Sequence, residues 1–284
     1  MPAVAYINFF EALFNNPFLL MAIFAGVAAS IASGITGSFI VVKRIVFISG
    51  SIAHSVLGGM GFFLWLRRTY SVNFITPMQG AIIAALASAL IMGYVRSRYK
   101  EREDTIIAAL WSTGMALGVI FIALTPGYNV ELMNFLFGNI LWATSSDIFM
   151  LCVLDALILT MTFFFYKRFQ ALCFDEDQAT LQGISVGKLY SLLLCMIALS
   201  IVLLIQVVGS ILVIAILAIP AAIAGNLTSK LSKMMVLAVT FAIGFTLLGF
   251  YISYECNWPP GATISLTAAL IYTAALLKKQ KSSC

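Results

Sequence analysis

Nine apolar runs, each long enough to cross a bilayer, constrain this sequence more than any other feature. They cover residues 18–42, 45–66, 78–95, 105–125, 146–166, 187–206, 208–227, 234–253 and 262–277. An apolar helix needs about 20 residues to span the hydrocarbon core of a bilayer. With 62% hydrophobic and only 10% charged residues, the chain has too few polar side chains to cover a soluble surface. We therefore predict an all-α, multi-pass membrane protein with nine spanning helices, or eight if one run does not cross.

The stretch 187–227 holds two of these runs with almost no loop between them. A single straight helix of this length would measure about 60 Å, twice the thickness of the hydrocarbon core. The chain must therefore reverse direction inside the stretch. The sequence Gln-Val-Val-Gly at 206–209 is the predicted corner.

Lys and Arg residues are distributed unevenly among the loops. With the N-terminus outside and nine spans, Arg67 and Arg68 lie outside and the other 14 of the 16 lie inside. Cytoplasmic loops carry the excess of Lys and Arg, so this orientation is the predicted one, with the C-terminus in the cytoplasm. No loop can hold a soluble domain of useful size. Residues 1–284 are therefore expected to form a single transmembrane permease domain.

Several classes of protein are excluded by what the sequence lacks. The positive residues form short clusters between apolar runs, without a basic face interleaved with aromatics, so nucleic acid is not an expected partner. The chain has no Walker A sequence, no HExxH and no GxSxG, and we expect no enzymatic activity. Active transport would therefore draw its energy from a partner ATPase or from an ion gradient.

His54 is the only histidine, and it lies about nine residues into the second apolar run. An ionisable side chain inside a spanning helix must face protein or a water-filled cavity, and it usually has a function. Imidazole is also the commonest side-chain metal ligand. Small residues surround His54 and leave space beside it. The pattern predicts a site that handles a cation, and the alternative is a buried imidazole that only bridges helices.

Three acids could share a cation with His54. Asp155 lies about nine residues into the fifth run, also near the midplane, while Asp147 lies near the outer mouth of that run and Glu131 in an outer loop. A cation that enters from outside would meet Glu131 or Asp147 before His54. For Asp155 the alternative is a carboxyl group hydrogen-bonded to a neighbouring helix.

An acidic segment at 174–184 lies on the predicted cytoplasmic side. Asp175 is expected to cap a short helix over 176–182, with further acids in its first turn and Gly183 closing it. Such a helix is either a docking surface or a solvated connector.

Several segments, in order along nearly the whole chain, carry a resemblance to a known family. The chain resembles the permease subunits of ATP-binding-cassette importers for zinc, manganese and iron(II). The segments are KRIVFISGSIAHSVLG at 43–58, EDTII at 103–107, LFGNIL at 136–141, FDEDQATLQGI at 174–184, QVVGSIL at 206–212, IPAA at 219–222 and PGA at 260–262.

The resemblance implies partners and a location. It implies a bacterial cytoplasmic (inner) membrane, a second permease subunit in a homodimer or heterodimer, cytosolic ATP-binding-cassette ATPase subunits and an extracytoplasmic metal-binding protein. It also implies that the acidic segment is the coupling helix seated on the ATPase. The residues that this assigns to coupling are Asp175, Glu176, Gln178, Ala179 and Gly183.

The resemblance also bears on the metal path. It implies that an aspartate commonly lies one helical turn before the histidine, and Ser51 takes that position here. The resemblance therefore assigns His54 to the metal path without its usual carboxylate partner. Asp147 or Asp155 could supply a carboxylate in place of the missing one. Imidazole suits zinc and carboxylates suit manganese, so the loss of an aspartate favours zinc slightly.

The predicted function is the transmembrane subunit of an ATP-driven importer of a divalent metal ion, zinc or manganese and possibly iron, that holds no permanent cofactor. The alternative is a stand-alone secondary transporter or channel for metal cations. That alternative needs a proton or sodium relay, which His54 and Asp155 could supply. An intramembrane enzyme is disfavoured because one histidine without a nearby second ligand makes a poor catalytic metal site.

Overall fold

The protein is helical throughout the residues that the computed structural model describes, which are 9–72, 74–98, 103–127, 135, 138 and 140–282. Nine helices within these residues are long and apolar enough to cross a membrane. They are α2 (Pro17–Lys43), α3 (Val46–Tyr70), α4 (Pro77–Arg98), α5 (Glu103–Leu124), α7 (Ser145–Phe174), α9 (Val186–Val208), α10 (Ser210–Leu227), α11 (Leu231–Cys256) and α12 (Pro260–Ser282). The all-α fold with nine spanning helices is therefore confirmed.

Three short helices complete the described chain: α1 (Phe9–Asn15), the 3-10 turn η1 (Ile140–Trp142) and α8 (Glu176–Leu181). The sequence predicted only α8. The largest difference among the spans is α7, which continues to Phe174 although its apolar run ends near residue 166. The extra two turns carry Lys167 and Arg168, whose long side chains can extend toward the polar end of the helix.

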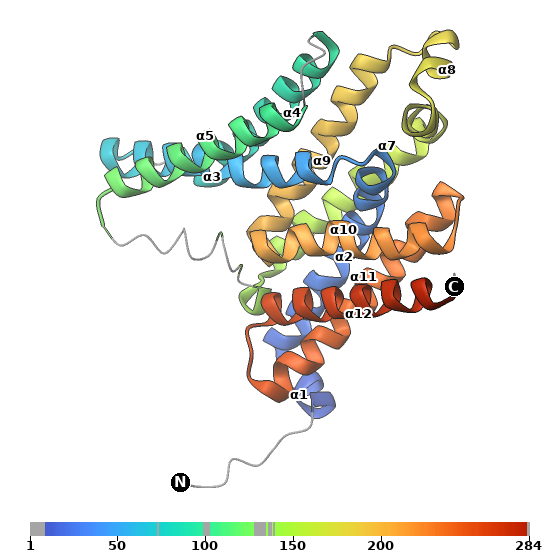
Figure 1. Cartoon of the computed structure of the whole chain (residues 1–284). Coiled ribbons are helices and arrows are strands. Elements are labelled where there is room, and N and C mark those ends of the chain that lie inside the picture. The colour runs from blue at the N-terminus through green and yellow to red at the C-terminus, as the bar shows by residue number, and fades with distance from the viewer. Residues whose placement is uncertain are drawn as a thin grey trace, which may run out of the picture.

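The helices form two groups joined by long central helices (Figure 1). In one group α3 packs closely against α4 and α5, and in the other α2 packs against α10 and α11, with α12 covering α10 and α11. Helix α9 contacts α4, α3, α7 and α2 and so joins the two groups. Helix α8 lies at one end of the molecule, beyond the end of α7.

Glycines allow the closest helix approaches, as expected where lipid gives no hydrophobic drive for helices to associate. A Cβ atom on Gly37 of α2 would lie 2.0 Å from the Leu217 carbonyl oxygen of α10, and one on Gly59 of α3 would lie 2.2 Å from the Gly80 oxygen of α4. Backbone therefore touches backbone at both crossings, and no other residue fits there. The pair Gly114 and Gly118 of α5 has the same role against α3.

The reversal between α9 and α10 occurs at a single residue, Gly209. Its φ of 82° lies in the left-handed region that favours glycine, and its N–H donates to the Ile205 carbonyl at 2.9 Å as α9 ends. Helix α10 begins at the next residue, Ser210. The predicted corner at 206–209 is therefore confirmed, with the turn at its last residue.

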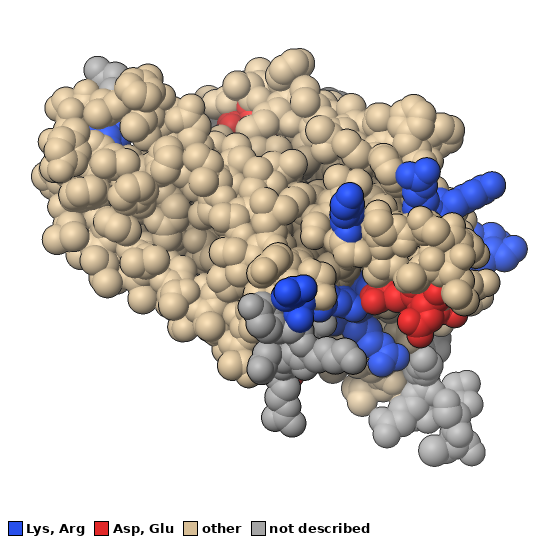
Figure 2. All heavy atoms as spheres, turned by 90° about the horizontal axis from the view of Figure 1, so that it is seen from above, with Lys and Arg blue, Asp and Glu red and all other residues tan. Residues whose placement is uncertain are grey.

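Seen from above, most of the surface carries no charge (Figure 2). The visible Lys and Arg side chains gather mainly at one end, beside a compact acidic patch. Such a division between a wide uncharged belt and a charged end is typical of a protein that lies across a bilayer.

Candidate functional site

His54 lies on α3 and faces α5. Its imidazole stacks on the Trp111 ring, with centroids 4.4 Å apart and planes 16° from parallel. Trp111 is held in turn by a hydrogen bond from its indole N–H to the Met115 sulfur at 3.2 Å. The imidazole is half-buried, and we find no hydrogen bond between it and another described residue. One face of His54 is therefore fixed by the indole, and its ring nitrogens remain available to a ligand.

Ser51, one turn before His54, faces the same neighbouring helix. Its hydroxyl donates to the Ile107 carbonyl of α5 at 3.0 Å, and only 1% of the residue is exposed. The hydroxyl proton is thus engaged in holding α3 to α5. Ser55 makes a similar link on the other side, with its Oγ 2.8 Å from that of Ser88 on α4.

We expect Ser51→Ala to leave metal transport close to the wild-type rate. Its hydroxyl is committed to a helix contact, whose loss destabilises the fold by about 1 kcal/mol. The measurement is uptake of radioactive or fluorescent metal, normalised to the amount of protein in the membrane. A large loss of uptake at normal membrane levels would instead assign Ser51 a role as a metal ligand.

Asp147 is engaged at the start of α7. It forms a capping box with Thr144, whose N–H and hydroxyl donate to Asp147 Oδ2 at 3.0 and 2.7 Å. Its other oxygen, Oδ1, accepts from the Gln206 amide at 3.3 Å. Both carboxylate oxygens therefore already hold the end of α7 next to the end of α9.

Asp155 lies in a different interface, buried between α7 and α2 beside the Ala32 backbone. Its Oδ1 has no hydrogen-bond partner among the described residues. The sequence placed Asp155 and His54 at similar depth, but the fold directs Asp155 toward α2 and His54 toward α5. Glu131, the remaining acid predicted to meet the cation, lies outside the described residues.

These positions bear on the prediction that an acid compensates for Ser51. Among the described residues, no three His, Cys, Asp or Glu side chains come close enough to form a metal site. The described neighbour that His54 contacts through its ring is Trp111. That it shares an ion with Asp147, Asp155 or Glu131 stays a prediction.

The second candidate region is α8, the short acidic helix. Asp175 caps it as predicted, with its Oδ1 accepting from the Gln178 N–H at 2.9 Å. Gly183 has a φ of 78°, and the next N–H, from Ile184, donates back to the Ala179 carbonyl at 3.0 Å to close the helix. The helix ends at Leu181, one residue earlier than expected.

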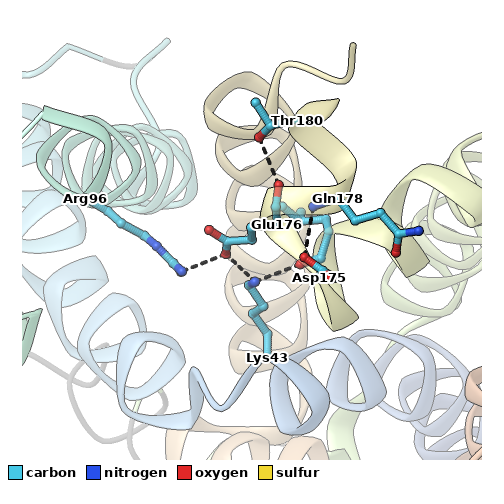
Figure 3. Close-up of polar contacts among 7 residues, drawn as sticks. Lys43, Arg96, Asp175, Glu176, Gln178 and Thr180 are labelled. Atoms are coloured by element: carbon cyan, nitrogen blue, oxygen red, sulfur yellow. Dashed lines mark hydrogen bonds and ion pairs between the residues drawn. The ribbon is translucent and has the colours of Figure 1, made fainter. Parts of the chain in front are cut away.

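Glu176 points into the protein, not away from it (Figure 3). Its Oε1 accepts from Lys43 at the end of α2 and from Arg96 Nη2 at the end of α4, the latter at 2.8 Å. Lys43 also donates to the Leu172 carbonyl at 2.7 Å, and the Arg96 guanidinium lies 4.1 Å from the centre of the Tyr190 ring on α9. One carboxylate thus joins α8 to the ends of two spanning helices.

The other face of α8 is free. Ala179 is fully buried, whereas Asp177, Gln178 and Thr180 are exposed and Leu181 is 88% exposed. The predicted coupling residues therefore divide between two faces. Glu176 and Ala179 attach the helix to the protein, and Gln178 belongs to the exposed face.

Sequence reasoning missed Trp111, Lys43, Arg96 and Tyr190. Arg96 entered only as a charge in the orientation count, and Lys43 entered there and as the first residue of the segment at 43–58, with no partner predicted for either. Their partner Glu176 is 133 and 80 residues away along the chain, and no local pattern links such distant positions. Trp111 carried no signal of its own because aromatics are common in apolar helices.

Comparison with known proteins adds independent information. The model of the ABC 3 transport family matches residues 15–279. The chain is 46% identical to a probable metal transport system membrane protein of Chlamydia pneumoniae, over 93% of this chain and 89% of that protein. It is 36% identical to the manganese transport system membrane protein MntC of Listeria monocytogenes, over 95% and 93% of the two chains. A solved structure of PsaBC from Streptococcus pneumoniae in complex with Fab matches with a TM-score of 0.81 at 30% identity, over 94% of this chain and 93% of that one.

Proposed function

The chain belongs to the ABC 3 transport family of metal transport permeases, and from this premise we propose that it is the membrane subunit of an ATP-driven importer of a divalent transition-metal ion. The observation that carries the proposal is the division of α8 into an attached face and a free face. Glu176 ties this helix to α2 and α4, while Gln178 and Leu181 remain exposed for a partner. A helix built in this way suits the transfer of force from a cytosolic ATPase into the spanning helices.

We propose an orientation in which α8 faces the cytoplasm, the N-terminus lies outside and the membrane is the bacterial inner membrane. The support is the count of Lys and Arg: the ends of α2, α4 and α7 all carry positive residues on the side of α8. The proposed partners are ATPase subunits on that side, a second permease subunit and a metal-binding protein on the opposite side. The whole chain acts as a single membrane domain in this proposal.

Manganese is the first candidate for the transported ion, and zinc is the second. A relative 36% identical to this chain is named for manganese transport. The half-buried imidazole of His54, which belongs to no acid-rich metal cluster in the described part of the chain, is the reason to retain zinc. In both cases His54 is the proposed contact with the ion along the path.

The proposal is tested by reconstituting the permease in proteoliposomes with a candidate ATPase and a candidate metal-binding protein. We expect Mn²⁺ or Zn²⁺ delivered by that protein to stimulate ATP hydrolysis several-fold. We also expect the ion to accumulate on the side of the membrane that holds the ATPase. An unchanged hydrolysis rate with each divalent metal would contradict the proposal. Uptake that persists without ATP and follows the membrane potential would support a secondary transporter instead.

A further inference from the structure

A groove between α2, α7 and α11 has no role in the proposed transport path. Its volume is about 910 Å³, within the range of roughly 300–1,000 Å³ typical of ligand pockets. Its walls are mainly apolar and include Ile31 and Ile35 of α2, Leu159 of α7 and Val239 of α11. These residues lie well inside spanning helices, so the groove is at the depth of the bilayer.

The surface around the groove is suited to lipid. Phe163 and Phe164 line it and are 81% and 74% exposed, which in a spanning helix directs two large apolar rings toward the hydrocarbon. In a membrane, lipid acyl chains contact exposed apolar rings of this kind. The groove is therefore open to a lipid that approaches from the membrane plane.

One end of the groove is basic. Lys167 and Arg168 of α7 line it together with Ser232, the second residue of α11. Neither basic side chain forms an ion pair with a described carboxylate. Arg168 also lines a neighbouring polar pocket with Lys188 of α9. Positive charge therefore concentrates where the apolar groove reaches the polar end of the helices, which suits an anionic headgroup.

Thr162 provides an independent sign of a ligand. It is 8% exposed, it lines the groove, and its Oγ1 has no hydrogen-bond partner among the described residues. Other buried hydroxyls of the spanning helices, such as those of Thr36 and Ser200, donate to the carbonyl four residues earlier. Since an unpaired buried hydroxyl is unfavourable, the Thr162 oxygen is expected to bond to a molecule in the groove.

We propose that this groove binds an anionic glycerophospholipid of the leaflet that faces α8. The phosphate pairs with Lys167 and Arg168, an acyl ester carbonyl accepts from the Thr162 hydroxyl, and the chains lie along Ile35, Leu159 and Val239. Thr162 precedes Lys167 by five residues, or about 7.5 Å along the helix, so the hydroxyl lies deeper than the charges. A glycerophospholipid presents its phosphate and its esters in the same order of depth.

Native mass spectrometry of the purified full-length chain, titrated with phosphatidylglycerol or phosphatidylcholine, tests the proposal. We expect tighter binding of phosphatidylglycerol, and a loss of roughly tenfold in its affinity in the double variant Lys167→Gln, Arg168→Gln. Thr162→Val, which keeps the shape, should weaken both lipids. Val239→Trp should reduce binding by filling the groove.

The matched control is Lys230→Gln, Lys233→Gln, which removes two charges at the start of α11 that do not line the groove. An equal loss of affinity in this control would overturn the proposal in favour of general surface attraction. Unchanged binding in the Lys167, Arg168 variant, or in Val239→Trp, would overturn it as well. Efficient disulfide-linked dimers of Phe163→Cys in membranes would show that a second copy of the chain covers the groove, and would also overturn it.

Discussion

Replacing His54 with alanine is expected to reduce metal uptake to background, a loss of at least about tenfold, while the protein remains folded in the membrane. Away from the charged ends of α3 and α5, the imidazole is the single ionisable group of these two helices, and its nitrogens are not used by other described residues. Its removal takes away the proposed ligand. The fold loses only one aromatic stack, worth about 0.5–1.5 kcal/mol.

The measurement is metal uptake by cells or proteoliposomes, together with membrane levels and thermal stability of each variant. Trp111→Phe is the matched control because it alters the same contact and keeps an aromatic ring beside His54. We expect it to retain most of the uptake. Normal uptake by His54→Ala at normal membrane levels would show that the imidazole only fills space between α3 and α5.

Changes on the two faces of α8 are expected to separate attachment of the ATPase from coupling to transport. Leu181→Arg places a charge on the most exposed large apolar side chain of α8 and should prevent the ATPase from copurifying with the permease. Glu176→Gln leaves that face intact but removes the charge that pairs with Lys43 and Arg96. It should retain the ATPase and its hydrolysis while metal transport falls.

The assays are copurification, ATP hydrolysis and metal uptake in the same preparation. Gln178→Ala is a milder change on the exposed face, and we expect it to reduce copurification of the ATPase less than Leu181→Arg does. Asp177→Asn is the control for a lost charge on α8 outside the ion pairs, and it should preserve coupling. If Glu176→Gln lost the ATPase as fully as Leu181→Arg, the division into an attached and a free face would be wrong.

Much of the fold followed from local patterns. The nine spans, the reversal near Gly209 and the cap of α8 by Asp175 each depend on residues within a few positions of one another. The end of α7 was misjudged because its last two turns contain charged residues, which hydropathy alone assigns to a loop. Those turns are stabilised by contacts with neighbouring elements, such as the edge-to-face contact of Phe169 with Phe39 of α2.

For the candidate site, the sequence identified individual residues but not the contacts between them. His54 and the acidic segment were recognisable because ionisable groups are rare in this chain, and rarity in an apolar helix is itself a signal. Their surroundings were not recognisable. The sequence placed Asp155 at the depth of His54 and Asp147 at the outer mouth of the same run, as acids that could share a cation with it. The fold instead engages Asp147 with Thr144 and Gln206 and buries Asp155 against α2.

The sequence by itself identified the segments that can cross the bilayer, although not the full length of α7, because the thickness of the hydrocarbon core acts on every segment separately. The tertiary structure alone decided which helices meet and which side chains share a contact. Inside a membrane all apolar faces are nearly equivalent, so lateral packing depends on single close approaches such as Gly37 against Leu217. The same holds for the pairing of Glu176 with Lys43 and Arg96, which exists only once three distant segments have come together.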